Sequence, residues 1–176
     1  MTEQEIQDIC KKYKIKNYTI NPDGSIDVNG DVWLYNMRLY KIPIKFNKVS
    51  GYFSCHNNFL KTLENSPIEV GSFYCSNNNL TTLEGGPKIV FDQFDCSFTK
   101  LTSLKWSPDL VHGVFNCQYN NLTSLEGHPT KVGGEIYCSR NPLETIEGFN
   151  LPYDKLIYEY KEKLIRKTKL KILEVL

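Results

Sequence analysis

The sequence predicts a right-handed solenoid of the α/β class, in which parallel strands line one concave face. Five cysteines recur 20 or 21 residues apart, and a leucine follows each of them after five residues. Phenylalanine or isoleucine stands two residues before each of the same cysteines. One turn of about 21 residues cannot bury its own apolar side, so neighbouring turns must stack to form a core. The recurring cysteines are Cys55, Cys75, Cys96, Cys117 and Cys138.

Residues 1–27 are expected to cap the N-terminal end of the solenoid. Thr2 and Glu5 form a capping box ahead of a helix over residues 3 to about 15. The apolar side chains of this segment recur at helical spacing. A β-hairpin follows over residues 18–28, because two short β-branched runs flank the turn sequence Asn-Pro-Asp-Gly.

Residues 28–151 are expected to form about six turns with the unit F-x-C-x-x-N-x-L-x-x-L-E-G-x-P-x-x-V. Phe and Cys stand two residues apart, so both point to the same, inner side of a strand. Leucines fill the rest of the coil, and the G-x-P stretch returns the chain. An asparagine three residues after the cysteine should bond the loop backbone of its own and the adjacent turn. These asparagines are Asn58, Asn78, Asn120 and Asn141, and the series is interrupted by Met37 and Thr99.

Residues 152–176 are expected to form a capping helix that begins near Pro152. Its apolar stripe would cover the last turn. The outer face is rich in lysine, and we interpret it as the solvated side of a cap. A basic patch for nucleic acid or an acidic protein is the alternative. The stripe consists of Leu156, Ile157, Tyr160, Leu164, Ile165, Ile172, Leu173 and Leu176.

The recurring cysteines are interpreted as small apolar core fillers. Zinc sites need ligands that converge, usually as close pairs, whereas these thiols come once per turn. Disulfides between neighbouring turns have unfavourable geometry because the side chains run parallel. The three histidines occupy different repeat positions, and no nucleophile has a partner that the spacing brings near it. We therefore predict no enzyme activity, no metal site and no cofactor.

Composition bears on the location and on the class of partner. The net charge is +1, from 21 basic and 20 acidic residues, which gives no electrostatic reason to expect nucleic acid. No apolar run approaches the roughly 20 residues that cross a bilayer, so no membrane partner is expected. The N-terminus begins acidic and polar rather than as a secretory signal. A cytoplasmic protein is the resulting expectation.

The outward strand positions are the expected binding surface. Four columns of six residues should lie side by side on the concave sheet; seven of these 24 residues are aromatic and none is lysine. Protein interfaces are enriched in Tyr, Trp and Arg and depleted of Lys. The alternative explanation is that aromatic residues simply suit β-strands. The predicted partner-binding residues are Trp33, Tyr35, Tyr52, His56, Tyr74, Asp95, Phe98, Tyr119, Glu135, Tyr137 and Arg140.

The chain resembles the leucine-rich-repeat family, whose pattern is L-x-x-L-x-L-x-x-N-x-L-x-x-L. Val70, Phe73, Cys75, Asn78, Leu80 and Leu83 match this pattern position for position. The segments YTINPDGSIDVNGDVWL and CSNNNLTTLEGGPK look like those of leucine-rich-repeat proteins of large tailed bacteriophages. The resemblance covers nearly all of the chain before the last 25 residues.

This resemblance implies a non-catalytic protein-interaction module. Its expected partner is a bacterial host protein, such as a defence factor, which it would bind or inhibit in the host cytoplasm. Two alternatives remain open: a small-ligand or nucleotide sponge on the aromatic face, and nucleic-acid binding through the basic C-terminal helix. The sequence does not predict the oligomeric state.

Overall fold

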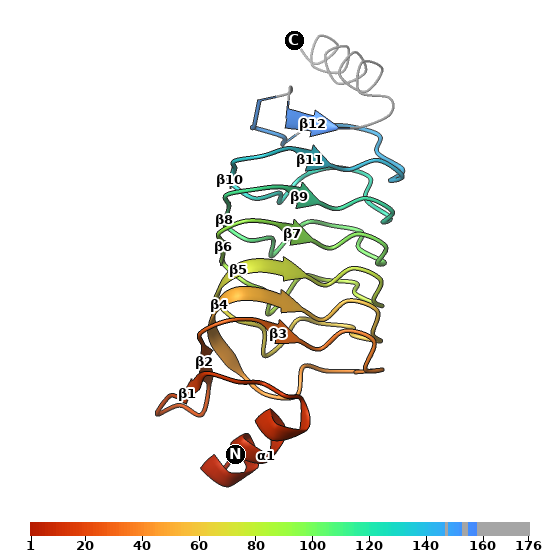
Figure 1. Ribbon diagram of the computed structural model, residues 1–176. Coiled ribbons are helices and arrows are strands. Elements are labelled where there is room, and N and C mark those ends of the chain that lie inside the picture. Colours follow the sequence, from red (N-terminus) through yellow and green to blue (C-terminus); the bar gives the residue numbers. More distant parts are fainter. Residues whose placement is uncertain (147, 153–154, 158–176) are drawn as a thin grey trace.

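The computed structural model describes residues 1–146, 148–152 and 155–157, and it shows a β-solenoid of about six turns (Figure 1). Its strands form one 12-stranded sheet in which the pairs between successive turns are parallel. The predicted solenoid and its parallel strands are therefore confirmed. The prediction of an α/β class overestimates the helix content, since the regular structure of the described residues is mostly strand and includes one short helix.

The first set of paired strands carries the predicted Phe-x-Cys segments, and we call it the Phe ladder. Phe53, Phe73, Phe94 and Phe115 are paired in register from turn to turn. Ile136 continues the series beside Phe115. The ladder comprises β3 (Val32–Trp33), the C-terminal part of β4 (Phe46–Ser54), the C-terminal part of β5 (Glu69–Tyr74), β7 (Phe94–Asp95), β9 (Phe115–Asn116), β11 (Ile136–Tyr137) and β12 (Leu156–Ile157).

A second set of parallel strands, the Val ladder, forms where the sequence analysis expects only a return stretch. Val49, Val70, Val90, Val111 and Val132 pair in register along it. It comprises β2 (Ile26–Val28), the N-terminal parts of β4 and β5, β6 (Ile89–Val90), β8 (Leu110–Val111) and β10 (Lys131–Val132). The turns from β2 to β11 therefore have two strand segments each, and β4 and β5 are the described strands that run through both ladders.

Glycines allow the chain to bend between the two ladders. A Cβ atom on Gly51 would lie 2.9 Å from the carbonyl oxygen of Gly30, and one on Gly113 would lie 2.6 Å from that of Asp92. Adjacent turns thus approach too closely at this bend for a side chain. Gly133 belongs to the same bend, and a Cβ atom on it would collide with the carbonyl oxygen of His112.

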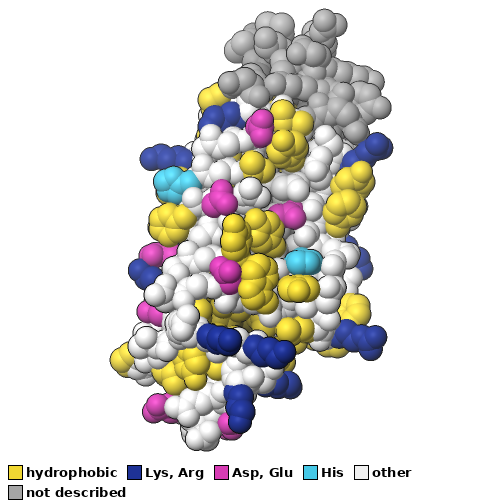
Figure 2. All heavy atoms as spheres, in the orientation of Figure 1, with side chains coloured by type: hydrophobic (Ala, Val, Ile, Leu, Met, Phe, Trp, Pro, Cys, Tyr) yellow, Lys and Arg dark blue, Asp and Glu magenta, His cyan; other side chains and the backbone are white. Residues whose placement is uncertain are grey.

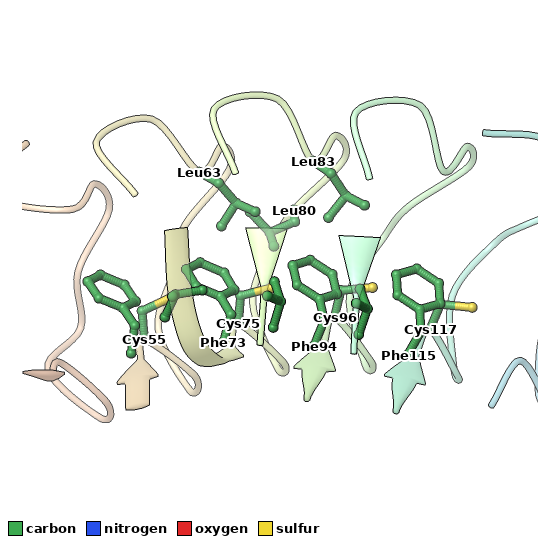
Figure 3. Close-up of a cluster of buried hydrophobic side chains, with 14 of the residues drawn as sticks. Cys55, Leu63, Phe73, Cys75, Leu80, Leu83, Phe94, Cys96, Phe115 and Cys117 are labelled. Atoms are coloured by element: carbon green, nitrogen blue, oxygen red, sulfur yellow. The ribbon is translucent and has the colours of Figure 1, made fainter. Parts of the chain in front are cut away.

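The core follows the predicted pattern. The Phe rings of neighbouring turns stack with centroids 5.3 to 5.6 Å apart and nearly parallel planes. The cysteine side chains lie beside them, with the leucines on the opposite side of the coil (Figure 3). All six cysteines are free and buried. Burial of a Phe ring stabilises the fold by about 2 to 3 kcal/mol, so the stacked column is a major part of the core.

The asparagine ladder is confirmed by its hydrogen bonds. The Nδ2 group of Asn78 donates to the carbonyl oxygens of Cys55 and Cys75, each at 3.0 Å, and its Oδ1 accepts from the Leu60 amide. Asn58, Asn120 and Asn141 repeat these contacts in their own turns. Thr99 breaks the series as expected: its hydroxyl lies 3.1 Å from the carbonyl oxygen of Cys96 in its own turn and 2.5 Å from Asn120 Oδ1, and either oxygen can accept its one proton.

The N-terminal cap matches the prediction. Helix α1 (Glu3–Lys12) ends a few residues before the expected limit. Its capping box is present, with the Glu5 amide 3.2 Å from Thr2 Oγ1 and the Thr2 amide 2.7 Å from the Glu5 carboxylate. Strand β1 (Tyr18–Ile20) pairs antiparallel with β2. Because β2 also pairs parallel with β4, the cap supplies the first strand of the Val ladder.

The described start of the predicted helix, which was expected over residues 152–176, is not helical at Leu156 and Ile157. Leu156 and Ile157 form β12, which extends the Phe ladder beyond β11. The backbone of Cys138 donates to the Ile157 carbonyl oxygen at 3.1 Å. A free strand edge carries backbone N–H and C=O groups without hydrogen-bond partners. A further strand can supply those partners, whereas the apolar face of a helix cannot. Residues 158–176, with most of the predicted stripe and basic face, lie outside the described residues.

Within the part of the chain that the structure describes, no helix has the length and apolar character needed to cross a membrane.

Candidate functional site

Five rings form one continuous group on the outer surface of the Phe ladder, and we call it the aromatic cluster. It consists of Trp33, Tyr35, Tyr52, His56 and Tyr74. Figure 2 shows hydrophobic side chains gathered along the middle of this face, with acidic side chains beside them. The structure therefore brings together five of the predicted partner-binding residues.

Buried serines beneath the rings explain how the cluster packs. Trp33, Ser54 and Tyr74 follow one another on successive strands, and Tyr52 is paired with Ser72. Ser54 and Ser72 are 1% and 2% exposed. Since Trp33, Tyr52 and Tyr74 each have a serine as a neighbour along the strand order, they can lean towards a ring of the next column. Tyr52 thus lies between Trp33 and Tyr74, with ring centroids 6.1 Å from each.

Ring contacts and a hydrogen bond hold the cluster together, and its rings remain accessible. Trp33, Tyr35 and Tyr52 are 47%, 43% and 44% exposed. Tyr35 stacks on His56 with centroids 5.1 Å apart and an interplanar angle of 2°. His56 Nδ1 shares a hydrogen bond of 2.7 Å with the hydroxyl of Ser54. A partner that binds these rings would therefore lose little side-chain entropy in ordering them.

A shallow depression of about 200 Å³ continues the face towards the C-terminal end. Tyr74, Asp95, Asn116 and Tyr137 occupy successive strands along it. The Asp95 carboxylate accepts a hydrogen bond of 3.0 Å from the Ser97 amide. The structure thus places three of the predicted site residues, Tyr74, Asp95 and Tyr137, around one hollow.

Burial and nearby carboxylates raise the pKa values of Tyr74 and Tyr137, the two tyrosines of this depression. Burial raises the pKa of Tyr74 above its ordinary value, and the nearby Asp92, Tyr52 and Asp95 add to this. A hydrogen bond to Glu135, 3.2 Å from hydroxyl to carboxylate, raises the pKa of Tyr137. Both phenols are therefore neutral donors near pH 7.

The fourth predicted column lies at the rim of the face instead of on the sheet. Its six residues follow the strands and adopt the left-handed backbone conformation, with φ between 52° and 60°. Within this column Phe98 and Tyr119 stack with centroids 4.1 Å apart. The column consists of Asn36, Asn57, Asn77, Phe98, Tyr119 and Arg140.

Trp106 is an exposed aromatic residue that the sequence analysis missed. The residue is 47% exposed and its backbone has a φ of 72°. The ammonium nitrogens of Lys88 and Lys105 lie over its ring system, 5.7 and 5.2 Å from the ring centroid. Gly85 and Gly127 hold the equivalent backbone position in the neighbouring turns. The signal was available in the sequence, because Lys105-Trp106 replaces the Glu-Gly of the repeat unit.

Two larger hollows lie away from the aromatic cluster. One of about 760 Å³ lies against the N-terminal cap, between the hairpin turn and residues 41–45. Another of about 340 Å³ lies along the Val ladder, between Asn29 and Phe91. The Lys48–Glu69 ion pair, 2.9 Å long, joins two of its lining residues.

The cysteines are placed for packing. Burial raises the pKa of the Cys75, Cys96 and Cys117 thiols well above their ordinary value, so they stay protonated. The Cys75 sulfur lies 3.3 Å from the carbonyl oxygen of Asp95. Across residues 1–146, 148–152 and 155–157, no three His, Cys, Asp or Glu side chains come together in a group that could hold a metal ion.

Comparisons of the chain with protein-family models, with curated proteins and with solved structures found no match.

Proposed function

We propose that this protein is a non-catalytic interaction scaffold that binds a protein partner through the outer surface of the Phe ladder. The observation that carries the proposal is the aromatic cluster, in which five rings contact one another while three of them stay more than 40% exposed. Isolated exposed aromatic residues are common on protein surfaces, whereas a contiguous rigid group marks an interaction site.

The surroundings of the cluster support the same function. Serine and asparagine alternate with tyrosine on this face, and lysine is absent from its outward strand positions. Tyrosine supplies a large contact area at low entropic cost, and serine and asparagine supply adaptable hydrogen bonds. Lysine, whose side chain is costly to order, is depleted in interfaces.

We further propose that the turns are leucine-rich repeats and that the partner is a bacterial host protein. The spacing of Phe, Cys, Asn and Leu and the asparagine ladder support the repeat family. The resemblance to phage-encoded proteins supports the partner, and a role in the cytoplasm of an infected host follows from it.

The test is capture of a partner from bacterial lysate by immobilised protein, followed by measurement of its affinity. The double variant Trp33→Ala/Tyr74→Ala should weaken binding at least tenfold, because truncated aromatic anchors typically cost 2 kcal/mol or more. The matched control is Tyr40→Ala/Phe59→Ala, which removes another exposed ring pair, with centroids 5.3 Å apart, outside the cluster.

Thermal unfolding should change little in the control variant, since Tyr40 and Phe59 are exposed, and only modestly in the cluster variant, since Trp33 is exposed and Tyr74 is half-buried. Equal affinity of the wild type and the cluster variant would overturn the proposal. A nucleotide or other small aromatic compound recovered in place of a protein would favour the small-ligand alternative. The nucleic-acid alternative rests on lysines mostly within residues 158–176, which lie outside the described part of the chain.

A further inference from the structure

The charged groups on the Phe-ladder face are mostly carboxylates. Asp31, Asp95 and Glu135 occupy outward positions along its length, and Asp92 lies at the adjoining bend. The basic residue of the four outward columns is Arg140, at the rim. The whole chain carries a net charge of +1, so this face concentrates negative charge.

Asp95 is the carboxylate best placed to contact a ligand. It lies on β7 between Tyr74 on β5 and Asn116 on β9, within the depression. Its Oδ1 atom accepts from the Ser97 amide, and its Oδ2 atom has no hydrogen-bond partner among the described residues. The side chain is half-buried, so a neutral partner that covered it would leave a charge with neither water nor a counter-ion.

The surrounding groups suit a cation. Tyr74 and Tyr137 stand three strands apart in the same column, which corresponds to roughly 14 Å at the usual strand spacing. An arginine or lysine side chain can lie along a hollow of this length. Aromatic faces attract such cations, and the side-chain oxygens of Gln93 and Gln118, which line the hollow, can accept hydrogen bonds.

We propose that the depression between Tyr74 and Tyr137 binds a basic side chain, arginine above all, presented by the partner protein, with Asp95 as its counter-ion. This inference rests on the proposed function and names the chemistry of the partner's contact. Arginine fits best because its planar guanidinium can donate to Asp95 while it stacks on a tyrosine ring. An acidic or purely apolar partner surface would leave Asp95 repelled or unpaired.

Fluorescein-labelled octapeptides test the inference directly by fluorescence anisotropy. The probes are (Gly-Arg)₄, (Gly-Ser)₄ and (Gly-Glu)₄, each at low and at physiological salt. The wild type should bind (Gly-Arg)₄ at least tenfold more tightly than either other peptide. The preference should shrink as salt rises, because part of the depression is open to solvent.

Asp95→Asn is the decisive variant because the asparagine keeps the Oδ1 atom that accepts from the Ser97 amide. It should weaken (Gly-Arg)₄ binding about tenfold. Asp109→Asn is the matched control, since it removes the same charge from an exposed residue beside the Val ladder. Equal binding of (Gly-Arg)₄ by all three proteins, or a preference of the wild type for (Gly-Glu)₄, would overturn the inference.

The two proposals fail separately. A captured partner that binds Asp95→Asn as tightly as the wild type, but is lost with Trp33→Ala/Tyr74→Ala, would keep the scaffold function and overturn the cation site. Peptide binding that depends on Asp95, together with partner binding that survives the loss of Trp33 and Tyr74, would overturn the proposed function and leave the cation site standing.

Discussion

The rings of Phe98 and Tyr119 stack at 4.1 Å, and both residues hold the left-handed backbone conformation, with φ of 52° and 53°. Asn36, Asn57 and Asn77 occupy the same position in the earlier turns. Asparagine tolerates this conformation, whereas a bulky side chain is strained in it by about 1 kcal/mol. Two adjacent turns thus combine strain with the exposure of a large apolar ring. Strain of this kind is concentrated at functional positions, so the pair extends the proposed interface to the rim.

The first prediction separates this strain from the ring contact. Phe98→Asn and Phe98→Ala both remove the stack on Tyr119, but only asparagine relieves the backbone. The asparagine variant should therefore be more stable than the alanine variant by about 1 kcal/mol. Urea unfolding of the two variants measures the difference. Asn77→Ala is the control and should cost a similar amount, because it introduces the same strain where no ring is lost. Equal stability of the two Phe98 variants would refute the argument.

Trp106 provides an independent second prediction of the same kind. Its φ of 72° is close to the 79° and 83° of Gly85 and Gly127 in the neighbouring turns. The Trp106→Gly variant should therefore be more stable than the Trp106→Ala variant by about 1 kcal/mol. At ordinary backbone angles the alanine variant would be the more stable of the two. Thermal or urea unfolding decides it. An alanine variant that is the more stable would show that the left-handed angle is not maintained.

The inward side of the fold was predictable because it depends on spacing alone. Phe73 and Cys75 stand two residues apart on one strand, so both enter the core, and Asn78 follows where the strand turns. The Val ladder was not predictable in this way, since strands of two residues, such as β6, show no alternation. Leu156 and Ile157 were assigned to a helix because their apolar neighbours recur at helical spacing, whereas the open edge of β11 decides their conformation.

The candidate site was predicted in its residues but not in its arrangement. Columns of outward residues follow from the repeat, and they identified Trp33, Tyr52 and Tyr74. The leaning of these rings over buried serines depends on side-chain packing, which periodicity does not encode. Asn57 and Asn77 were an indication of the left-handed backbone at the rim, because asparagine tolerates this conformation. The sign of φ, however, leaves no periodic signal in the sequence.

The third prediction concerns the asparagine ladder. Asn78→Thr should lower the free energy of unfolding by about 1 to 3 kcal/mol. Threonine can keep a bond within its own turn, as Thr99 does, but it leaves the Leu60 amide without an acceptor, whereas the Cys55 carbonyl keeps its bond from Asn58 Nδ2. Each buried group left unpaired costs about 1 to 3 kcal/mol. The reverse change, Thr99→Asn, should raise stability and serves as the control. A loss below 0.5 kcal/mol for Asn78→Thr would mean that the ladder contributes little.

The fourth prediction uses the buried thiols and concerns alkaline pH. Burial raises the pKa of the Cys138 thiol from 9.0 to about 12, so the folded protein keeps a proton that the unfolded chain loses near pH 9. The stability linked to this proton is fully present below pH 9 and is lost as the pH rises towards 12, by about 1.4 kcal/mol per pH unit. Cys138→Ala removes this dependence and leaves a constant cost for the lost packing.

Urea unfolding of the wild type and of Cys138→Ala, at pH 7.5 and again at pH 10.5, measures the effect. The stability advantage of the wild type should shrink by about 2 kcal/mol at the higher pH. The reason is that pH 10.5 lies 1.5 units above the pKa of the Cys138 thiol in the unfolded chain, and each unit costs about 1.4 kcal/mol. Ionisation of tyrosines, lysines and the other cysteines affects both proteins alike and cancels in the difference. A stability difference that is the same at both pH values would show that Cys138 ionises as readily in the folded protein as in the unfolded chain. The prediction that the core beneath the Phe ladder excludes water would then be wrong.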